Sequence, residues 1–219
     1  MKKELLQAFP VIFWDFDGVI KESVDAKTQA FRALFVEYGV AVQDLVQQHH
    51  EQNGGLSRFQ KIPLYYENFL NKTLTSEEII LHCNRFGELA VQSVLESPWV
   101  DGVAAYLEKH YLNQTFFLIS ATPHEEIIEI ASRLKIQKYF QEIRGSSHDA
   151  KFSKATVLGQ IINQRNYAPE QCLMIGDSWT DYEAAKKNNV TFLLRETNLN
   201  HSIFASVSCE RISHFKQLI

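Results

Sequence analysis

The chain has 219 residues, of which 45% are hydrophobic, and its formal net charge is −4 at pH 7. This composition supports a packed core and argues against a disordered chain. The negative charge and the scattered Lys and Arg residues argue against a nucleic-acid partner, and no apolar run approaches the ~18 residues that a membrane-spanning helix needs. The three cysteines show no metal-ligand spacing, and we find no secretory signal, so we expect a cytoplasmic protein.

The first strand-like run leads directly into two aspartates. Val11–Trp14 are β-branched and aromatic, which is typical of a buried strand. Asp15 and Asp17 follow, on one face of the strand by alternation, and Gly18 then permits a sharp turn. Two close carboxylates repel each other unless a cation lies between them. We therefore predict a ligand site at this strand end; a solvated acidic turn is the alternative.

The next stretch, residues 21–96, contains no strand-like run. Its apolar residues recur at helical intervals, and Thr75 and Glu78 match a capping box before the last helical segment. A stretch of this length is typical of a small domain. We predict that an all-helical domain, residues 21–96, is inserted into a core domain formed by residues 1–20 and 97–219.

Strands and helices alternate in the rest of the chain. Short, almost continuous apolar runs occupy residues 116–119, 173–175 and 191–194, as in strands buried on both faces of a parallel sheet. Helical patterns occupy residues 124–134, 155–163 and 182–187. This order predicts an α/β fold.

Polar residues follow these strands as well. Ser120 and Ala121 follow the run that ends at residue 119, and Asp177 and Asp181 follow the run that ends at residue 175. Parallel strands end at one edge of their sheet, so we expect a convergent set: Asp15, Asp17, Ser120, a lysine (Lys151 or Lys154), Asp177 and Asp181. Taken singly, each also fits a structural role, such as a helix cap, a turn residue or a solvated charge.

Such a set suits phosphoryl transfer through a carboxylate nucleophile. Mg²⁺ prefers oxygen ligands, which Asp15 and Asp177 can supply, and the ion and a lysine can shield the phosphate charge. Asp17 can protonate the leaving oxygen and then activate water. The phosphoryl oxygens can be held by a hydroxyl and by backbone N–H groups at Ser120, Gly18 and Ala121.

These motifs resemble those of the haloacid dehalogenase-like hydrolases, and the resemblance covers nearly the whole chain. Residues 15–20 are similar to the family's DxDG motif, residues 117–120 to its strand that ends in Ser or Thr, and residues 176–181 to its GDSxxD motif. The helical insert lies where the family's C1-type cap does, and Pro98–Gly102 resembles the segment that re-enters the core. The resemblance implies a Rossmann-like, doubly wound parallel sheet with an inserted helical cap.

The resemblance also implies roles for single residues. Asp15 would be the nucleophile and a metal ligand, and Asp17 the acid/base, with its backbone carbonyl on the metal. Asp177 would bind Mg²⁺, and Asp181 would bind or support it; Ser120 would bind the phosphoryl group.

The motif lysine has two candidates. Lys154 stands at the start of a predicted helix, where cap-containing relatives have a lysine. Lys151 is our second choice, because Phe152 and Lys154 occupy the positions that are prolines in the longer version of the motif.

The loop around Gly54 and Gly55 interrupts the helical pattern of the insert, and Ser57 could cap the next helix. It resembles a cap loop of β-phosphoglucomutase-like members, in which an arginine reaches the substrate. Arg58 is therefore our candidate for binding an anionic or sugar group, with Lys61 a weaker one. The alternative is that Arg58 only pairs with a cap carboxylate.

We therefore expect a Mg²⁺-dependent phosphatase that hydrolyses a small phosphorylated metabolite, such as a sugar phosphate, through an aspartyl-phosphate. Dehalogenating family members lack an acid at the position of Asp17, so its presence favours phosphate-ester chemistry. A phosphomutase of the β-phosphoglucomutase type and a non-catalytic binding domain are the alternatives. The sequence carries no signal for substrate identity or oligomeric state.

Overall fold

The computed structural model describes residues 6–148 and 152–218. A parallel six-stranded sheet forms its centre, in the order β3-β2-β1-β4-β5-β6. The strands are β1 (Val11–Trp14), β2 (Thr115–Pro123), β3 (Phe140–Ser146), β4 (Cys172–Gly176), β5 (Thr191–Arg195) and β6 (Glu210–Ile212). The α-helices of the described residues are α2 (Val24–Leu34), α3 (Val40–Gln52), α4 (Arg58–Leu70), α5 (Ser76–Glu96), α6 (Val103–His110), α7 (His124–Arg133), α8 (Lys154–Arg165) and α9 (Trp179–Lys187).

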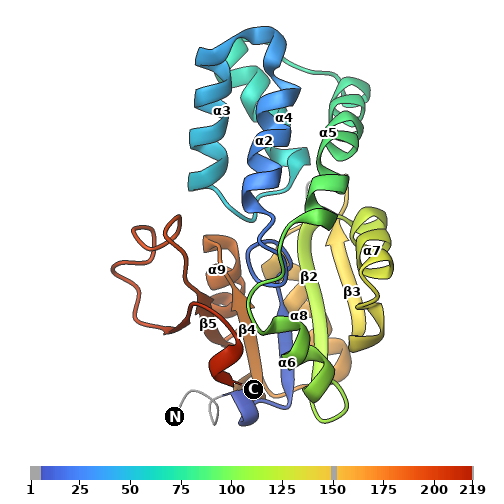
Figure 1. The fold of residues 1–219 in the computed structure, drawn as a ribbon, viewed down its shortest axis with the longest axis vertical. Coiled ribbons are helices and arrows are strands. Elements are labelled where there is room, and N and C mark those ends of the chain that lie inside the picture. The colour runs from blue at the N-terminus through green and yellow to red at the C-terminus, as the bar shows by residue number, and fades with distance from the viewer. Residues whose placement is uncertain (1–5, 149–151, 219) are drawn as a thin grey trace.

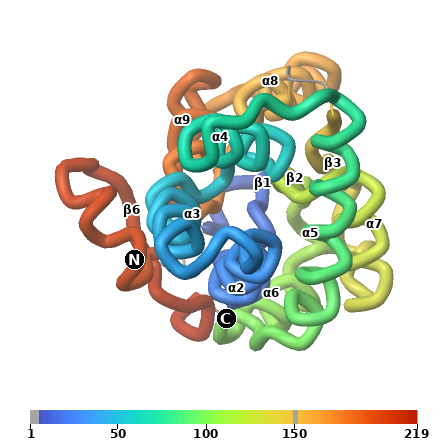
Figure 2. The backbone as a smooth tube through the Cα atoms, turned by 90° about the horizontal axis from the view of Figure 1, so that it is seen from above, coloured from blue at the N-terminus to red at the C-terminus, as the bar shows by residue number. Residues whose placement is uncertain are grey.

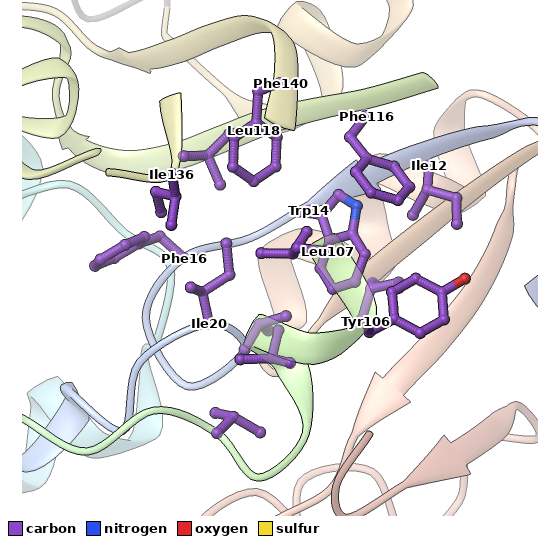
Figure 3. Close-up of a cluster of buried hydrophobic side chains, with 14 of the residues drawn as sticks. Ile12, Trp14, Phe16, Ile20, Tyr106, Leu107, Phe116, Leu118, Ile136 and Phe140 are labelled. Carbon is purple, nitrogen blue, oxygen red and sulfur yellow. The ribbon is translucent and has the colours of Figure 1, made fainter. Parts of the chain in front are cut away.

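Helices cover the sheet on both faces. Ile12 and Trp14 of β1 belong to a cluster with α6 and α7, whereas Val11 and Phe13 belong to a second cluster with α8 and α9. Figure 3 shows the first cluster, in which the Trp14 ring lies among side chains of β2 and α6. Because both faces of β1 are buried, its sequence is continuously apolar. The predicted α/β, doubly wound, Rossmann-like core is confirmed.

The helices α2–α5 lie together beyond the C-terminal ends of the strands (Figures 1 and 2). We call them the cap. They share a buried core of their own, in which the ring of Phe31 lies 4.1 Å from that of Phe86 and 5.6 Å from that of Tyr65, centroid to centroid. The proposed domain boundaries at residues 21 and 96 remain a prediction.

The two predicted N-terminal capping motifs of the cap helices, at Ser57 and Thr75, are both present. The Thr75 hydroxyl accepts a hydrogen bond from the Glu78 N–H at 3.3 Å, and the Thr75 N–H donates to the Glu78 carboxylate at 2.7 Å. Ser57 begins α4 through a capping box with Gln60. These contacts satisfy backbone N–H groups that a helix start leaves without partners.

Several elements do not follow from the sequence patterns. β3, β6, α3 and α6 were not predicted, and α9 begins at Trp179 rather than at Tyr182. β3 lies at the edge of the sheet, where a strand has one partner and can carry charged residues such as Glu142 and Arg144. No helix of the described residues is long and apolar enough to cross a bilayer.

Candidate active site

Three carboxylates meet at the C-terminal edge of the sheet. Asp15 follows β1, Asp177 follows β4, and Asp181 lies in the first turn of α9. β1 and β4 are paired in parallel, and the Asp15 N–H donates to the Ile175 carbonyl at 2.9 Å, so both strands end at the same level. One carboxylate oxygen from each aspartate lies within 4.8 Å of the other two.

Lys154 lies between two of these carboxylates. It is the first residue of α8, and its Nζ lies 2.7 Å from Asp15 Oδ1 and 2.6 Å from Asp181 Oδ1. Burial alone would lower the pKa of Lys154, but the two carboxylates raise it above its ordinary value. Lys154 is therefore a fixed cation within the site. The second choice, Lys151, lies outside the described residues.

The site gathers three carboxyl groups around one lysine. Burial raises the pKa of Asp15 to about 7, and the Asp181 carboxylate adds to this while Lys154 opposes it. Burial, followed by the Asp15 and Asp181 charges, also raises the pKa of Asp177 well above its usual range. One lysine does not balance three carboxylates, so the donor set fits a hard divalent cation with oxygen ligands.

Gly18 allows the chain to turn close to Asp177. Its φ of +74° lies in the region that favours glycine, and a Cβ at this position would overlap the Asp177 carboxylate. The Gly18 N–H donates to the Lys21 carbonyl at 2.7 Å, so in this arrangement it serves the turn.

Ser120 and Ala121 lie near the C-terminal end of β2. Ser120 is fully buried, and its hydroxyl accepts a hydrogen bond from the Thr122 N–H at 3.1 Å. Ala121 lines the cavity of the site, and its carbonyl accepts a hydrogen bond from the Ser146 hydroxyl at 2.8 Å.

Asp17 has different partners from Asp15. The strand ends at Trp14, so strand alternation does not extend to the two aspartates, although both line the same cavity. Asp17 accepts a hydrogen bond from the Ser23 hydroxyl at 2.6 Å and forms an ion pair with Lys27. Burial alone would raise the pKa of Asp17, but Lys27 and Ser23 bring it below its ordinary value.

Lys27 is a site residue that the sequence analysis missed. Its Nζ also donates to the Thr122 hydroxyl at 2.8 Å, so it links α2 with the end of β2. One signal was present: Ser23 and Lys27 are spaced four residues apart at the start of a helix that follows the Asp17 turn. The segment belongs to the predicted insert, yet its first turn reaches the sheet edge.

A cavity of about 570 Å³ lies between the sheet edge and the cap. Asp15, Asp17, Lys154 and Asp177 line it on the core side. The cap lines it with the loop of Gly54, Gly55 and Leu56 and with three helices, through residues that include Lys27, His50 and Lys61. Gly55 has φ +81°, and a Cβ there would overlap the Thr180 hydroxyl. The cap loop is therefore closed directly onto the motif that carries Asp177.

Arg58 does not line this cavity. Its guanidinium forms a two-pronged ion pair with Glu126 of α7, at 2.9 and 2.5 Å, and donates to the Cys83 carbonyl at 3.1 Å. The alternative to substrate binding was that Arg58 pairs with a carboxylate of the cap. Arg58 does form an ion pair, but its partner Glu126 belongs to the core. Arg58 thus connects cap and core here, and its role as a substrate contact remains a prediction.

Comparisons with known proteins agree with this arrangement. Two curated relatives are a 5'-nucleotidase from Pseudomonas aeruginosa, 23% identical over 83% of this chain and 80% of that protein, and a phosphoglycolate phosphatase from Colwellia psychrerythraea, 26% identical over 84% and 83%. A β-phosphoglucomutase structure from Clostridium difficile superposes with a TM-score of 0.76 at 18% identity, over 96% of this chain and 93% of that one. The family model described as haloacid dehalogenase-like hydrolase matches residues 11–194. The chain therefore belongs to the haloacid dehalogenase-like hydrolases.

Proposed function

We propose that the protein is a Mg²⁺-dependent phosphatase that hydrolyses a small phosphate monoester through a phosphorylated Asp15. The observation that carries the proposal is the group of Asp15, Lys154, Asp177 and Asp181, of which Asp15, Lys154 and Asp177 line a cavity under the cap. The curated relatives named as phosphatase and nucleotidase support the same class of reaction.

In the first step, a carboxylate oxygen of Asp15 attacks phosphorus and the bond to the leaving oxygen breaks. Protonated Asp17 gives its proton to that oxygen, so the product leaves as an alcohol. Lys154 lies 2.7 Å from Asp15 and lowers the charge that the incoming phosphate meets.

In the second step, water attacks phosphorus, its proton passes to Asp17, and the phosphorus–oxygen bond to Asp15 breaks. Inorganic phosphate and the free carboxylate result. The first step leaves Asp17 ionised, and the ion pair with Lys27 stabilises this state, which accepts the proton of water. That proton restores the acid form of Asp17 for the next turnover.

Mg²⁺ would be held by the carboxylates of Asp15 and Asp177, by the Asp17 carbonyl, and directly or indirectly by Asp181. When bound, the ion supplies charge neutralisation for the phosphoryl oxygens. An independent check is thermal unfolding: Mg²⁺ should raise the Tm of the wild type and leave that of Asp177→Asn unchanged.

The direct test uses p-nitrophenyl phosphate. The wild type should release phosphate with Mg²⁺ and stop when EDTA removes it, and Asp15→Asn should be inactive while keeping its fold. Normal turnover by Asp15→Asn would contradict the proposal.

A phosphomutase is the second candidate, because the closed cap covers the cavity and would shield a phosphorylated Asp15 from water. The measurement that separates the two is isomerisation of a hexose 1-phosphate without net release of phosphate.

A further inference from the structure

Lys61 is a buried cation on the cap side of the cavity. It lies in the first turn of α4, is 2% exposed, and lines the cavity opposite the carboxylates. Its Nζ lies 2.9 Å from His50 Nδ1 and 3.5 Å from the His50 carbonyl. In residues 6–148 and 152–218, no carboxylate lies within ion-pair distance of this ammonium group.

His50 holds Lys61 without neutralising it. Burial, followed by the charges of Lys61 and Lys27, lowers the pKa of His50 well below its ordinary value, so the ring is neutral. Its Nδ1 accepts the hydrogen bond from Lys61, and the ring also forms a hydrogen bond with the Val24 backbone. The imidazole thus fixes the position of the ammonium group without neutralising it. Asp17 and Asp177 oppose its charge only from beyond ion-pair distance.

Stability does not explain this position. Burial, assisted by Lys27, lowers the pKa of Lys61 to about 7, so the empty fold disfavours the charged form. The first turn of a helix is also the positive end of its dipole, which disfavours a cation there. Burying a cation without a carboxylate is costly, so an anion that enters the cavity is the natural partner.

The other cations near the cavity already have partners. Lys154 is paired with Asp15 and Asp181, Lys27 with Asp17, and Arg195 with Glu22. Arg58, the residue that the cap-loop resemblance favours, is held by Glu126 and does not line the cavity. Lys61 is left as the cap cation that can meet the leaving-group side of a substrate whose phosphate lies at Asp15.

We propose that Lys61, positioned by His50, binds a second acidic group on the leaving-group side of the substrate, so that the enzyme selects phosphate monoesters carrying a further carboxylate or phosphate. This inference rests on the proposed function and specifies its substrate class. A cavity of about 570 Å³ is large enough for a small ester of this kind.

Matched substrate pairs test the proposal. Phosphoglycolate is compared with hydroxyethyl phosphate, which replaces the carboxylate by a neutral group, and glucose 1,6-bisphosphate with glucose 1-phosphate. Wild type should prefer the acidic member of at least one pair, and the preferred pair identifies the acidic group as carboxylate or phosphate.

The variant Lys61→Met keeps the length of the side chain and removes its charge. It should lower kcat/KM for the preferred acidic substrate by roughly 10- to 100-fold, mainly through KM, because a hydrogen bond to a charged group is lost. The neutral partner should change by less than about 3-fold, and Lys61→Arg should restore much of the preference. His50→Gln should weaken the preference in the same direction.

Equal losses on acidic and neutral substrates would overturn the proposal, because Lys61 would then contact the transferred phosphoryl group or only support the fold. A wild type without preference would overturn it as well. If the wild type hydrolyses no ester, the proposed function fails. Titration calorimetry of ligand binding then tests the role of Lys61 separately. Phosphoglycolate binding that Lys61→Met abolishes would support it, and wild type that does not bind phosphoglycolate or glucose 1,6-bisphosphate would refute it.

Discussion

At the scale of single residues, the pKa of each carboxyl group in the site depends on which lysine it pairs with. Lys154 is shared by Asp15 and Asp181, whereas Asp17 has its own cation, Lys27. The two aspartates of one motif therefore have opposite environments. The pKa of Asp15 is raised by burial, and the pKa of Asp17 is lowered by Lys27 despite burial. A nucleophile must be ionised, so a bound cation beside Asp15 would have to lower its pKa, whereas the low pKa of Asp17 suits the step in which it accepts a proton.

Lys154→Met should reduce kcat by at least ~100-fold, because the attacking carboxylate and the incoming phosphate lose the cation that lies between Asp15 and Asp181. Steady-state kinetics with p-nitrophenyl phosphate measures this. Lys187→Met, an exposed lysine at the end of α9, is the matched control and should retain full activity. A fully active Lys154→Met would show that Lys151 or another cation fills the role.

At the scale of elements, the strands that carry the chemistry were the easiest to predict. β1, β2 and β4 are buried on both faces, so their residues are continuously apolar and the polar residues after them stand out. β3 lies at a sheet edge, and β6 is too short to show a pattern, so neither gives such a signal.

The contacts between cap and core could not be predicted in the same way. Lys27 reaches Asp17, and Arg58 reaches Glu126, across 10 and 68 residues of sequence. Sequence periodicity assigns a residue to the buried face of a helix, but it does not say which distant group that face meets. The Arg58 role was therefore open, and that of Lys27 was missed.

Gly55→Ala should prevent full closure of the cap, because a Cβ there overlaps the Thr180 hydroxyl. We expect KM to rise by about 10-fold or more, because an incompletely closed cap misplaces the residues that contact the substrate. Gly39→Ala is the control: its φ of +83° also strains an added side chain, but nothing lies within 4 Å of the added Cβ. Equal effects of both variants on KM would attribute the change to strain alone.

Glu126→Gln should weaken the connection between α4 and α7 and leave the Arg58 guanidinium buried without a full counter-charge. Breaking a buried pair costs about 3–5 kcal/mol when one partner is removed, and since a glutamine retains one acceptor we expect the lower part of that range. Chemical denaturation measures it. In a protein that already carries Arg58→Met, Glu126→Gln should lower the free energy of unfolding by much less. An equal loss in that background would exclude the ion pair as the cause.

At the scale of the whole molecule, the closed arrangement places the cap lysines Lys27 and Lys61 in the cavity that the carboxylates of the sheet edge also line. Lys61 faces charged or titratable groups of every neighbouring element: His49, His50, Lys27, Asp17 and Asp177. A buried cation of this kind links the stability of the fold to pH.

Lys61→Met should unfold at a higher temperature than wild type at pH 7, by at least about 2–4 °C, which corresponds to ~1 kcal/mol for a chain of this size. The pKa of Lys61 is 10.5 in the unfolded chain and about 7 in the folded one. The unfolded chain therefore binds more protons between these values, and this contribution to the free energy of unfolding rises with pH. The advantage of the variant should be full below pH 7 and shrink as the pH approaches 10.

Thermal melts of both proteins across this pH range, without ligand, measure the difference. Lys187→Met should show no such trend. An advantage that stays constant with pH would mean that Lys61 is not buried as a strained cation in the folded protein.

The most direct test of the account is to identify the phosphorylated residue during turnover. Wild type mixed with p-nitrophenyl phosphate and Mg²⁺ is quenched in acid within milliseconds, and its peptides are analysed by mass spectrometry. We predict a phosphoryl group on Asp15, absent without Mg²⁺ and absent from Asp15→Asn. A phosphoryl group on any other side chain, or rapid hydrolysis by Asp15→Asn, would contradict the assignment of Asp15 as the nucleophile.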